Sequence, residues 1–171
     1  ISQPFTDALA LYAIDLIAHN LVDVYKGRGT QESWEKITLA STIGGMVINT
    51  AGVTLAHGME HPASGLKDIV HGKGLAALTP VIIEASYKED HFKFAKIARI
   101  FGGITADDLA PKIRTLLKNL DLDVKLSDLG IEEKDIPWMA ENCMKVSAAS
   151  IANNPVVFTQ EEIAEIYKKA M

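Results

Sequence analysis

Apolar side chains recur at steps of three and four residues through most of the chain, which is the spacing of amphipathic helices. A first helix is predicted from Thr6 to about residue 25, with Leu9 and Leu16 on its apolar side. A second helix starts after a cap at Thr30 and runs toward residue 61. Its later half is apolar on all sides, which predicts a place in the middle of the domain, and Gly52 predicts a break in it.

The remaining pattern predicts several shorter helices. Pro62 disfavours helical backbone at His61, so residues 61–65 are predicted as a turn that is followed by a short helix over 66–70. The other predicted helices cover 72–84, 91–102, about 105–120, about 136 onward and 159–170, with caps at Thr105 and Thr159. Only residues 121–126 alternate like a strand. The sequence therefore predicts an all-α fold of seven to nine helices in one domain over residues 1–171.

Length and charge narrow the classes of function. The 171 residues are 48% apolar, enough for one domain to bury its own core. The formal net charge is −5 and the basic residues are scattered, which argues against a nucleic-acid partner. No apolar run of about 20 residues and no signal-like start are apparent, so neither membrane insertion nor export is expected.

Cys143 and Ile1 bear on the location of the protein and on whether the chain is part of a longer one. Cys143 is the only cysteine, so no internal disulfide forms, and its neighbours do not indicate an activated thiol. A reducing, cytoplasmic location is predicted. The chain starts at Ile1 rather than at methionine, which we interpret as a sign that it is a piece of a longer protein.

Three of the five histidines lie between residues 57 and 71. His57 and His61 are four residues apart, so a continuous helix would carry both on one face, and a turn could return His71 to the same place. Neutral imidazole is a common ligand of zinc, iron and copper. A histidine pair at this spacing is also compatible with ordinary hydrogen bonding or with a solvated face, and the nearby Glu60 and Asp68 are equally ambiguous.

The histidine-rich run AGVTLAHGMEHPASGLKDIVHGKGLAALTP closely resembles the second signature of the iron-containing (group III) alcohol dehydrogenases. That signature has one histidine, a second followed by proline, and a third followed by glycine. Residues 7–48 are similar to the helices that precede the signature in the family, and residues 153–171 resemble its C-terminal helix. Together these segments cover nearly all of the chain.

The resemblance implies a fold and a set of roles. Family members have an N-terminal α/β domain that binds NAD or NADP and an all-α C-terminal domain, with metal and substrate in the cleft between them. This chain resembles the C-terminal domain only, and the dinucleotide-binding domain is expected to be absent. The first and third signature histidines are metal ligands in the family, which carries over to His57 and His71. The middle histidine, His61, is then the catalytic candidate, as a proton acceptor beside the reacting alcohol.

The same resemblance limits what these residues can do. The family's other two ligands, an aspartate and a histidine, precede the segment that matches residues 7–48, so they would fall upstream of Ile1. The function implied is that of an NAD(P)-dependent dehydrogenase that interconverts small alcohols with aldehydes or ketones and uses Fe²⁺ or Zn²⁺ as Lewis acid. With half of the ligands present, the isolated chain is expected to bind metal weakly and to be inactive.

Other interpretations remain open. The chain could be a non-catalytic helical scaffold or interaction domain in which the histidines are incidental, and metal titration would distinguish this from a dehydrogenase. Glycerol dehydrogenases and dehydroquinate synthases share the implied architecture and could be the relevant relatives. A face that normally packs on a cofactor domain would be bare here, which favours self-association into a homo-oligomer.

Overall fold

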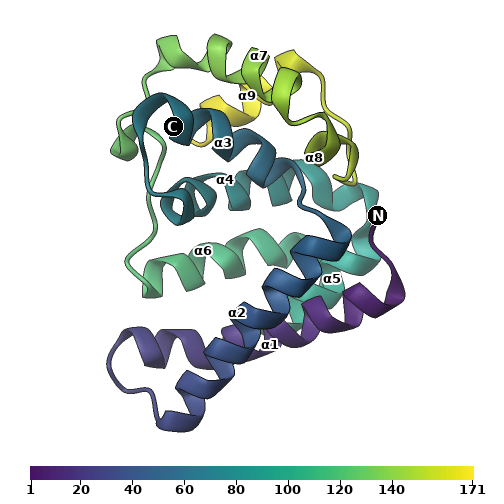
Figure 1. Ribbon diagram of the computed structural model, residues 1–171, viewed down its shortest axis with the longest axis vertical. Helices are drawn as coiled ribbons and strands as arrows, with labels where there is room; N and C mark the ends of the chain where they lie inside the picture. Colours follow the sequence, from purple (N-terminus) through teal and green to yellow (C-terminus); the bar gives the residue numbers. More distant parts are fainter. The chain divides into compact units, whose positions relative to one another are not determined.

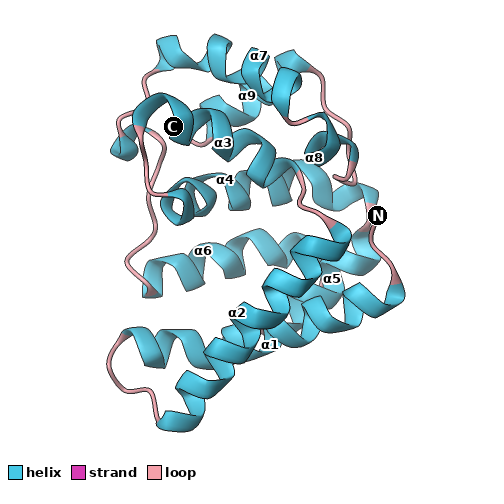
Figure 2. Cartoon of the chain, viewed as in Figure 1, coloured by secondary structure: helices cyan, strands magenta, loops and turns pink.

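The computed structural model describes residues 1–171 as helices joined by turns and short 3₁₀ segments, without β-strands (Figure 2). It contains nine α-helices, α1 to α9, so the predicted all-α fold is confirmed. The helices form two compact units, one from residues 1–52 with 92–121 and one from residues 53–91 with 122–171. The organisation as a single domain stays a prediction.

The first unit is built on a hairpin of α1 (Pro4–Tyr25) and α2 (Gln31–Ala51), which pack against each other (Figure 1). Gly27 has a φ of 72°, which suits glycine in the reversing turn. The Thr30 hydroxyl then accepts a hydrogen bond from the Ser33 amide at 3.2 Å and caps α2. The contact between the helices is made by Ala13, Leu16, Ala40 and Ile43. The predicted first helix and the cap at Thr30 are confirmed.

Two shorter helices complete the first unit, α5 (His91–Ile100) and α6 (Leu109–Asn119). The Asp108 carboxylate accepts hydrogen bonds from the amides of Thr105 and Ile104 at 2.9 and 2.7 Å. These bonds hold the pKa of Asp108 below its ordinary value, with the Thr105 bond as the larger cause. The capped start predicted at Thr105 is therefore confirmed.

Helix α2 does not occupy the central, fully buried place that its apolar later half predicts. Its buried residues are Ala40, Ile43 and Ala51. Met46 and Ile48 are 59% and 49% exposed. An apolar sequence indicates that burying its side chains is favourable, but it does not indicate which part of the protein covers them. In this structure α1 covers one face of α2.

Helix α1 bears on the expectation that the chain does not insert into a membrane. It has 22 residues and a mean hydropathy of 1.3 in its most apolar window, so by length and composition alone it is long and apolar enough to cross a bilayer. The sequence-based statement that no run is long enough is therefore too strict. Core helices of soluble proteins meet the same criterion, so the absence of a membrane-bound form stays a prediction.

The second unit packs five helices around one core (Figure 1): α3 (Leu55–Lys67), α4 (His71–Ser86), α7 (Ile136–Val146), α8 (Ala148–Ala152) and α9 (Gln160–Lys169). Its fully buried large side chains include Leu55, Met59, Leu78, Leu126, Ile131, Ile136, Met139, Ile163 and Tyr167. The helices predicted over 72–84, from about 136 and over 159–170 are confirmed. All three clustered histidines belong to this unit, on α3 and α4.

The turn predicted over residues 61–65 and the short helix predicted over 66–70 are wrong, because α3 continues through Pro62 to Lys67. Proline lacks the amide hydrogen that would bond the carbonyl four residues earlier, which belongs to Gly58. The hydroxyl of Ser147 in the α7–α8 junction donates to that Gly58 carbonyl at 3.1 Å instead. A partner from a distant segment therefore satisfies the group that proline leaves open, and the helix persists.

Candidate functional site

The candidate site starts where α2 gives way to α3. Gly52 ends α2 with a φ of 70°, and α3 begins at Leu55. The predicted break at Gly52 is confirmed. The new helix that follows it carries His57 and His61 one turn apart. The pair therefore lies on a continuous helix, as its spacing predicts.

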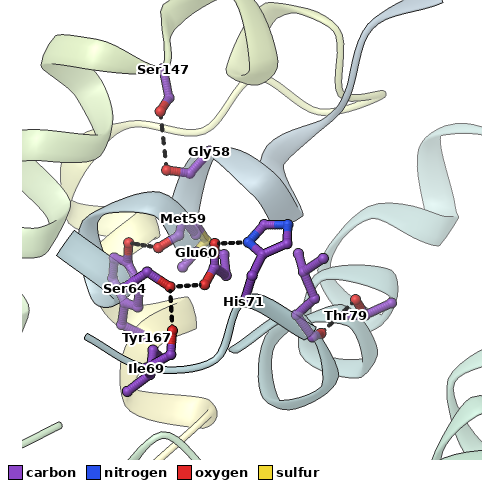
Figure 3. Close-up of polar contacts among 10 residues, drawn as sticks. Gly58, Met59, Glu60, Ser64, Ile69, His71, Thr79, Ser147 and Tyr167 are labelled. Carbon is purple, nitrogen blue, oxygen red and sulfur yellow. Dashed lines mark hydrogen bonds and ion pairs between the residues drawn. The ribbon is translucent and has the colours of Figure 1, made fainter. Parts of the chain in front are cut away.

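Contacts from other helices fix the backbone of α3 between these histidines. The Tyr167 hydroxyl on α9 donates to the Met59 carbonyl at 2.5 Å, and Ser147 donates to the neighbouring Gly58 carbonyl (Figure 3). Both donors are buried. Burial raises the pKa of the Tyr167 phenol above its ordinary value, so the group remains a neutral donor. The two contacts hold the turn of α3 that carries the site.

The chain returns to the same place through a tight connection. Asp68 ends α3 in the left-handed conformation, with a φ of 52°, and α4 begins at His71. The connection passes close to α3, with the Ile69 carbonyl 3.1 Å from the Ser64 hydroxyl. Three residues after Asp68, His71 faces α3 from the first position of α4 (Figure 3).

The three imidazole rings converge. Ring centroids are 5.2 Å apart for His57 and His71, 5.8 Å for His61 and His71, and 6.1 Å for His57 and His61. Desolvation by burial, followed by the charges of His71 and His61, lowers the pKa of His57 below its ordinary value. A lowered pKa favours neutral imidazole, which is the form that binds metal ions.

A carboxylate that the sequence left ambiguous belongs to the same cluster. Glu60 is fully buried on α3, its Oε2 contacts His71 Nδ1, and its Oε1 contacts the Ser64 hydroxyl (Figure 3). Glu60, His61 and His71 present one ligand atom each within 4.8 Å of one another, a grouping that can hold a metal ion. Asp68, the other ambiguous acid, is exposed at the end of α3 and is not in this grouping.

Sequence reasoning did not identify Glu60, Ser64 and Gly74 as site residues. An acid next to an exposed histidine resembles a surface residue, and the side of α3 that it occupies depends on the helix continuing through Pro62. Gly74 offers a weak signal, since a glycine inside a helix lowers helix stability and therefore suggests a packing reason. Its position faces Glu60, where an added Cβ would come within 2.8 Å of the carboxylate side chain.

Comparison with known proteins identifies what the chain resembles. A family model described as "Fe-containing alcohol dehydrogenase family, C-terminal" matches residues 1–171. The 1,3-propanediol dehydrogenase of Klebsiella pneumoniae is 34% identical over 177 residues, covering 99% of this chain and 45% of that protein. Alcohol dehydrogenase 4 of Saccharomyces cerevisiae is 32% identical over 173 residues, with the same coverages.

Solved structures give the same result. The crystal structure of an archaeal halo-thermophilic Red Sea brine pool alcohol dehydrogenase superposes with a TM-score of 0.93 and 31% identity, covering 99% of this chain and 45% of that one. The chain thus spans about 45% of the length of these relatives.

Proposed function

Because the chain belongs to the iron-containing alcohol dehydrogenase family and matches its C-terminal part, we propose that residues 1–171 form the metal- and substrate-binding side of an NAD(P)-dependent alcohol dehydrogenase. The observation that carries the proposal is the convergence of three imidazoles from α3 and α4, with ring centroids 5.2 to 6.1 Å apart. A small alcohol and the corresponding aldehyde or ketone are the proposed substrates.

His57 and His71 are the proposed metal ligands, for Fe²⁺ or Zn²⁺. Their rings form the closest of the three pairs, and neutral nitrogen donors suit either ion. The alternative set of Glu60, His61 and His71 is less suitable. The Glu60 carboxylate is fully buried, and its two oxygens already contact His71 and Ser64. To bind an ion that substrate can reach, it would have to turn away from these contacts.

The reaction needs a group that accepts the alcohol proton, and His61 is the proposed acceptor. It is exposed, so substrate can approach it, and it stands on α3 one turn from His57. Histidine is the side chain that most often accepts or donates a proton in catalysis, because its neutral imidazole has a basic nitrogen. A divalent ion, when bound, supplies Lewis acidity that favours loss of the alcohol proton, and a nicotinamide supplies the hydride acceptor.

Two further ligands and most of the nicotinamide contacts are proposed to come from the part of the relatives' length that these 171 residues do not span. This follows the family pattern of an aspartate and a histidine ahead of the matched segment. We therefore expect the 171-residue chain to bind metal weakly and to show no alcohol oxidation alone. NAD(P)-dependent turnover by the purified chain would overturn this expectation.

Metal titration tests the ligand assignment. Purified chain is titrated with Co²⁺ or Zn²⁺, and the affinities of His57→Ala and His71→Ala variants are compared with that of His19→Ala, which removes an exposed imidazole on α1. We expect both site variants to lose at least about 10-fold in affinity, as loss of a ligand or its support does elsewhere, while the control keeps its affinity. Binding that survives loss of both His57 and His71 would refute the assignment.

A chimera tests the activity itself. The part of the Klebsiella pneumoniae relative that precedes its match to this chain is fused to Ile1, and oxidation of 1,3-propanediol is followed through NAD(P)H absorbance. Turnover that requires metal and falls strongly in His61→Ala, with metal content unchanged, is the expected result. A folded, metal-loaded chimera in which His61→Ala turns over at the same rate would contradict the proposed proton acceptor. A scaffold protein would show neither metal binding nor turnover.

A further inference from the structure

We propose that Glu60 is a positioning residue: its buried carboxylate holds the Nδ1–H of His71, so that the other ring nitrogen, Nε2, keeps its lone pair and is free to bind a metal ion. The metal part of this inference rests on the proposed function, whereas the orientation of His71 does not. The roles assigned to residues 57, 61 and 71 do not account for Glu60, and its place in the structure is unusual for a glutamate.

The environment of Glu60 indicates a specific task. It is 0% exposed, while the His71 side chain that it contacts is 50% exposed. Burying a carboxylate costs free energy unless it has partners. Both of its oxygens have one, Oε2 at His71 Nδ1 and Oε1 at the Ser64 hydroxyl, and no buried side-chain polar atom in the chain lacks a partner.

The hydrogen-bonding capacities of these groups define the tautomer of His71. An ionised carboxylate only accepts, so the nitrogen that faces it must carry hydrogen. Neutral imidazole has one hydrogen, and if Nδ1 carries it, Nε2 keeps its lone pair. Carboxylate, imidazole and metal ion in this order form a common arrangement in which the carboxylate orients the ring and increases its basicity.

Gly74 provides the space that Glu60 occupies. A Cβ built on Gly74 would lie 2.8 Å from both Cγ and Oε1 of Glu60, closer than non-bonded atoms approach. Glu60 is held at its far end by His71 and Ser64, so it cannot move aside without losing those contacts. Glu60 on α3 therefore fits against α4 because Gly74 has no side chain.

Nitrogen NMR tests the orientation without any metal. The chain is labelled with ¹⁵N and studied metal-free at increasing pH until the His71 signals no longer change, with His71 assigned by loss of its signals in His71→Ala. We expect protonated, pyrrole-type Nδ1 and bare, pyridine-type Nε2 at His71. A wild-type spectrum with the proton on Nε2 would overturn the inference directly.

Two variants and a control extend the test. Glu60→Gln keeps an oxygen acceptor and should retain the tautomer, whereas Glu60→Ala should shift the proton of His71 toward Nε2. Glu133→Gln changes an exposed glutamate of the same unit and should leave the His71 signals unchanged. If Glu60→Ala folds and leaves the tautomer as in the wild type, Glu60 does not set it.

Metal binding separates this inference from the proposed function. We expect Glu60→Ala to weaken Co²⁺ binding about 10- to 100-fold and to change the visible spectrum of the bound ion, with Glu60→Gln closer to wild type. Wild-type chain that binds no metal but shows the expected tautomer would refute the proposed function and leave the orientation by Glu60 standing. Equal affinities and spectra for wild type and Glu60→Ala would refute the role of Glu60 toward the metal.

Discussion

The pairing of Glu60 with Gly74 makes a quantitative prediction about stability. Gly74→Ala places a methyl group 2.8 Å from Glu60 Cγ and Oε1, in a buried contact between α3 and α4. Overpacking of this kind typically costs about 1–3 kcal/mol. Replacing glycine by alanine inside a helix gains up to about 1 kcal/mol, which offsets part of that cost. We expect Gly74→Ala alone to lower the free energy of unfolding by up to about 2 kcal/mol.

Removing the glutamate side chain should reverse the sign. In a Glu60→Ala background the atoms that the new methyl group would meet are gone, so only the gain in helix propensity remains. Gly74→Ala should then raise the free energy of unfolding by up to about 1 kcal/mol. The difference between the two backgrounds is a coupling energy of about 1–3 kcal/mol, well above the additivity error of about 0.5 kcal/mol for independent sites.

Urea denaturation followed by far-ultraviolet circular dichroism measures all four proteins of this cycle. Unchanged slopes with urea concentration are the condition for comparing the free energies of unfolding. If Gly74→Ala has the same effect in both backgrounds within about 0.5 kcal/mol, the two positions do not compete for space and the argument for a shared arrangement fails.

Three further predictions concern the rest of the structure. Ser147→Ala should lower the free energy of unfolding by about 1–3 kcal/mol, because it leaves the Gly58 carbonyl unpaired. The loss should be smaller in a Pro62→Ala background, where the restored amide at residue 62 can bond that carbonyl. Equal losses in both backgrounds, measured by urea denaturation, would contradict this account of Pro62. Burial raises the pKa of the Cys143 thiol from 9.0 to about 11. The native chain should therefore react with iodoacetamide at least about 100-fold more slowly than the chain unfolded in urea. Similar rates would show that the thiol is accessible. Thr159→Ala should destabilise α9 by about 1 kcal/mol through loss of its cap, whereas Thr159→Ser should be nearly neutral; equal loss in both variants would argue against the cap.

Most helices could be predicted because local physics determines them. The apolar periodicity of residues 6–25 and the caps at Thr30, Thr105 and Thr159 depend on nearby residues only, and these features are found where predicted. The path of α3 through Pro62 could not be predicted in the same way. It depends on a hydroxyl 89 residues away in the sequence.

The same distinction applies to the site. The spacing of His57 and His61 was enough to place both on one helix, and His71 returns to them as expected. Glu60 could not be recognised, because its burial depends on which side of α3 packs against α4 and on the absence of a side chain at Gly74. The contact between Glu60 and Gly74 follows from the packing of the two helices and cannot be read from one sequence.

The most direct test of the account is the position of a metal ion bound to this chain. Crystals of the chain grown with Zn²⁺ would be measured above and below the zinc absorption edge. The account predicts one anomalous peak about 2.0–2.1 Å from ring nitrogens of His57 and His71, with Nε2 as the ligand atom of His71 and with Glu60 still at its Nδ1. A peak on Glu60 together with His61, or binding away from α3 and α4, would contradict it.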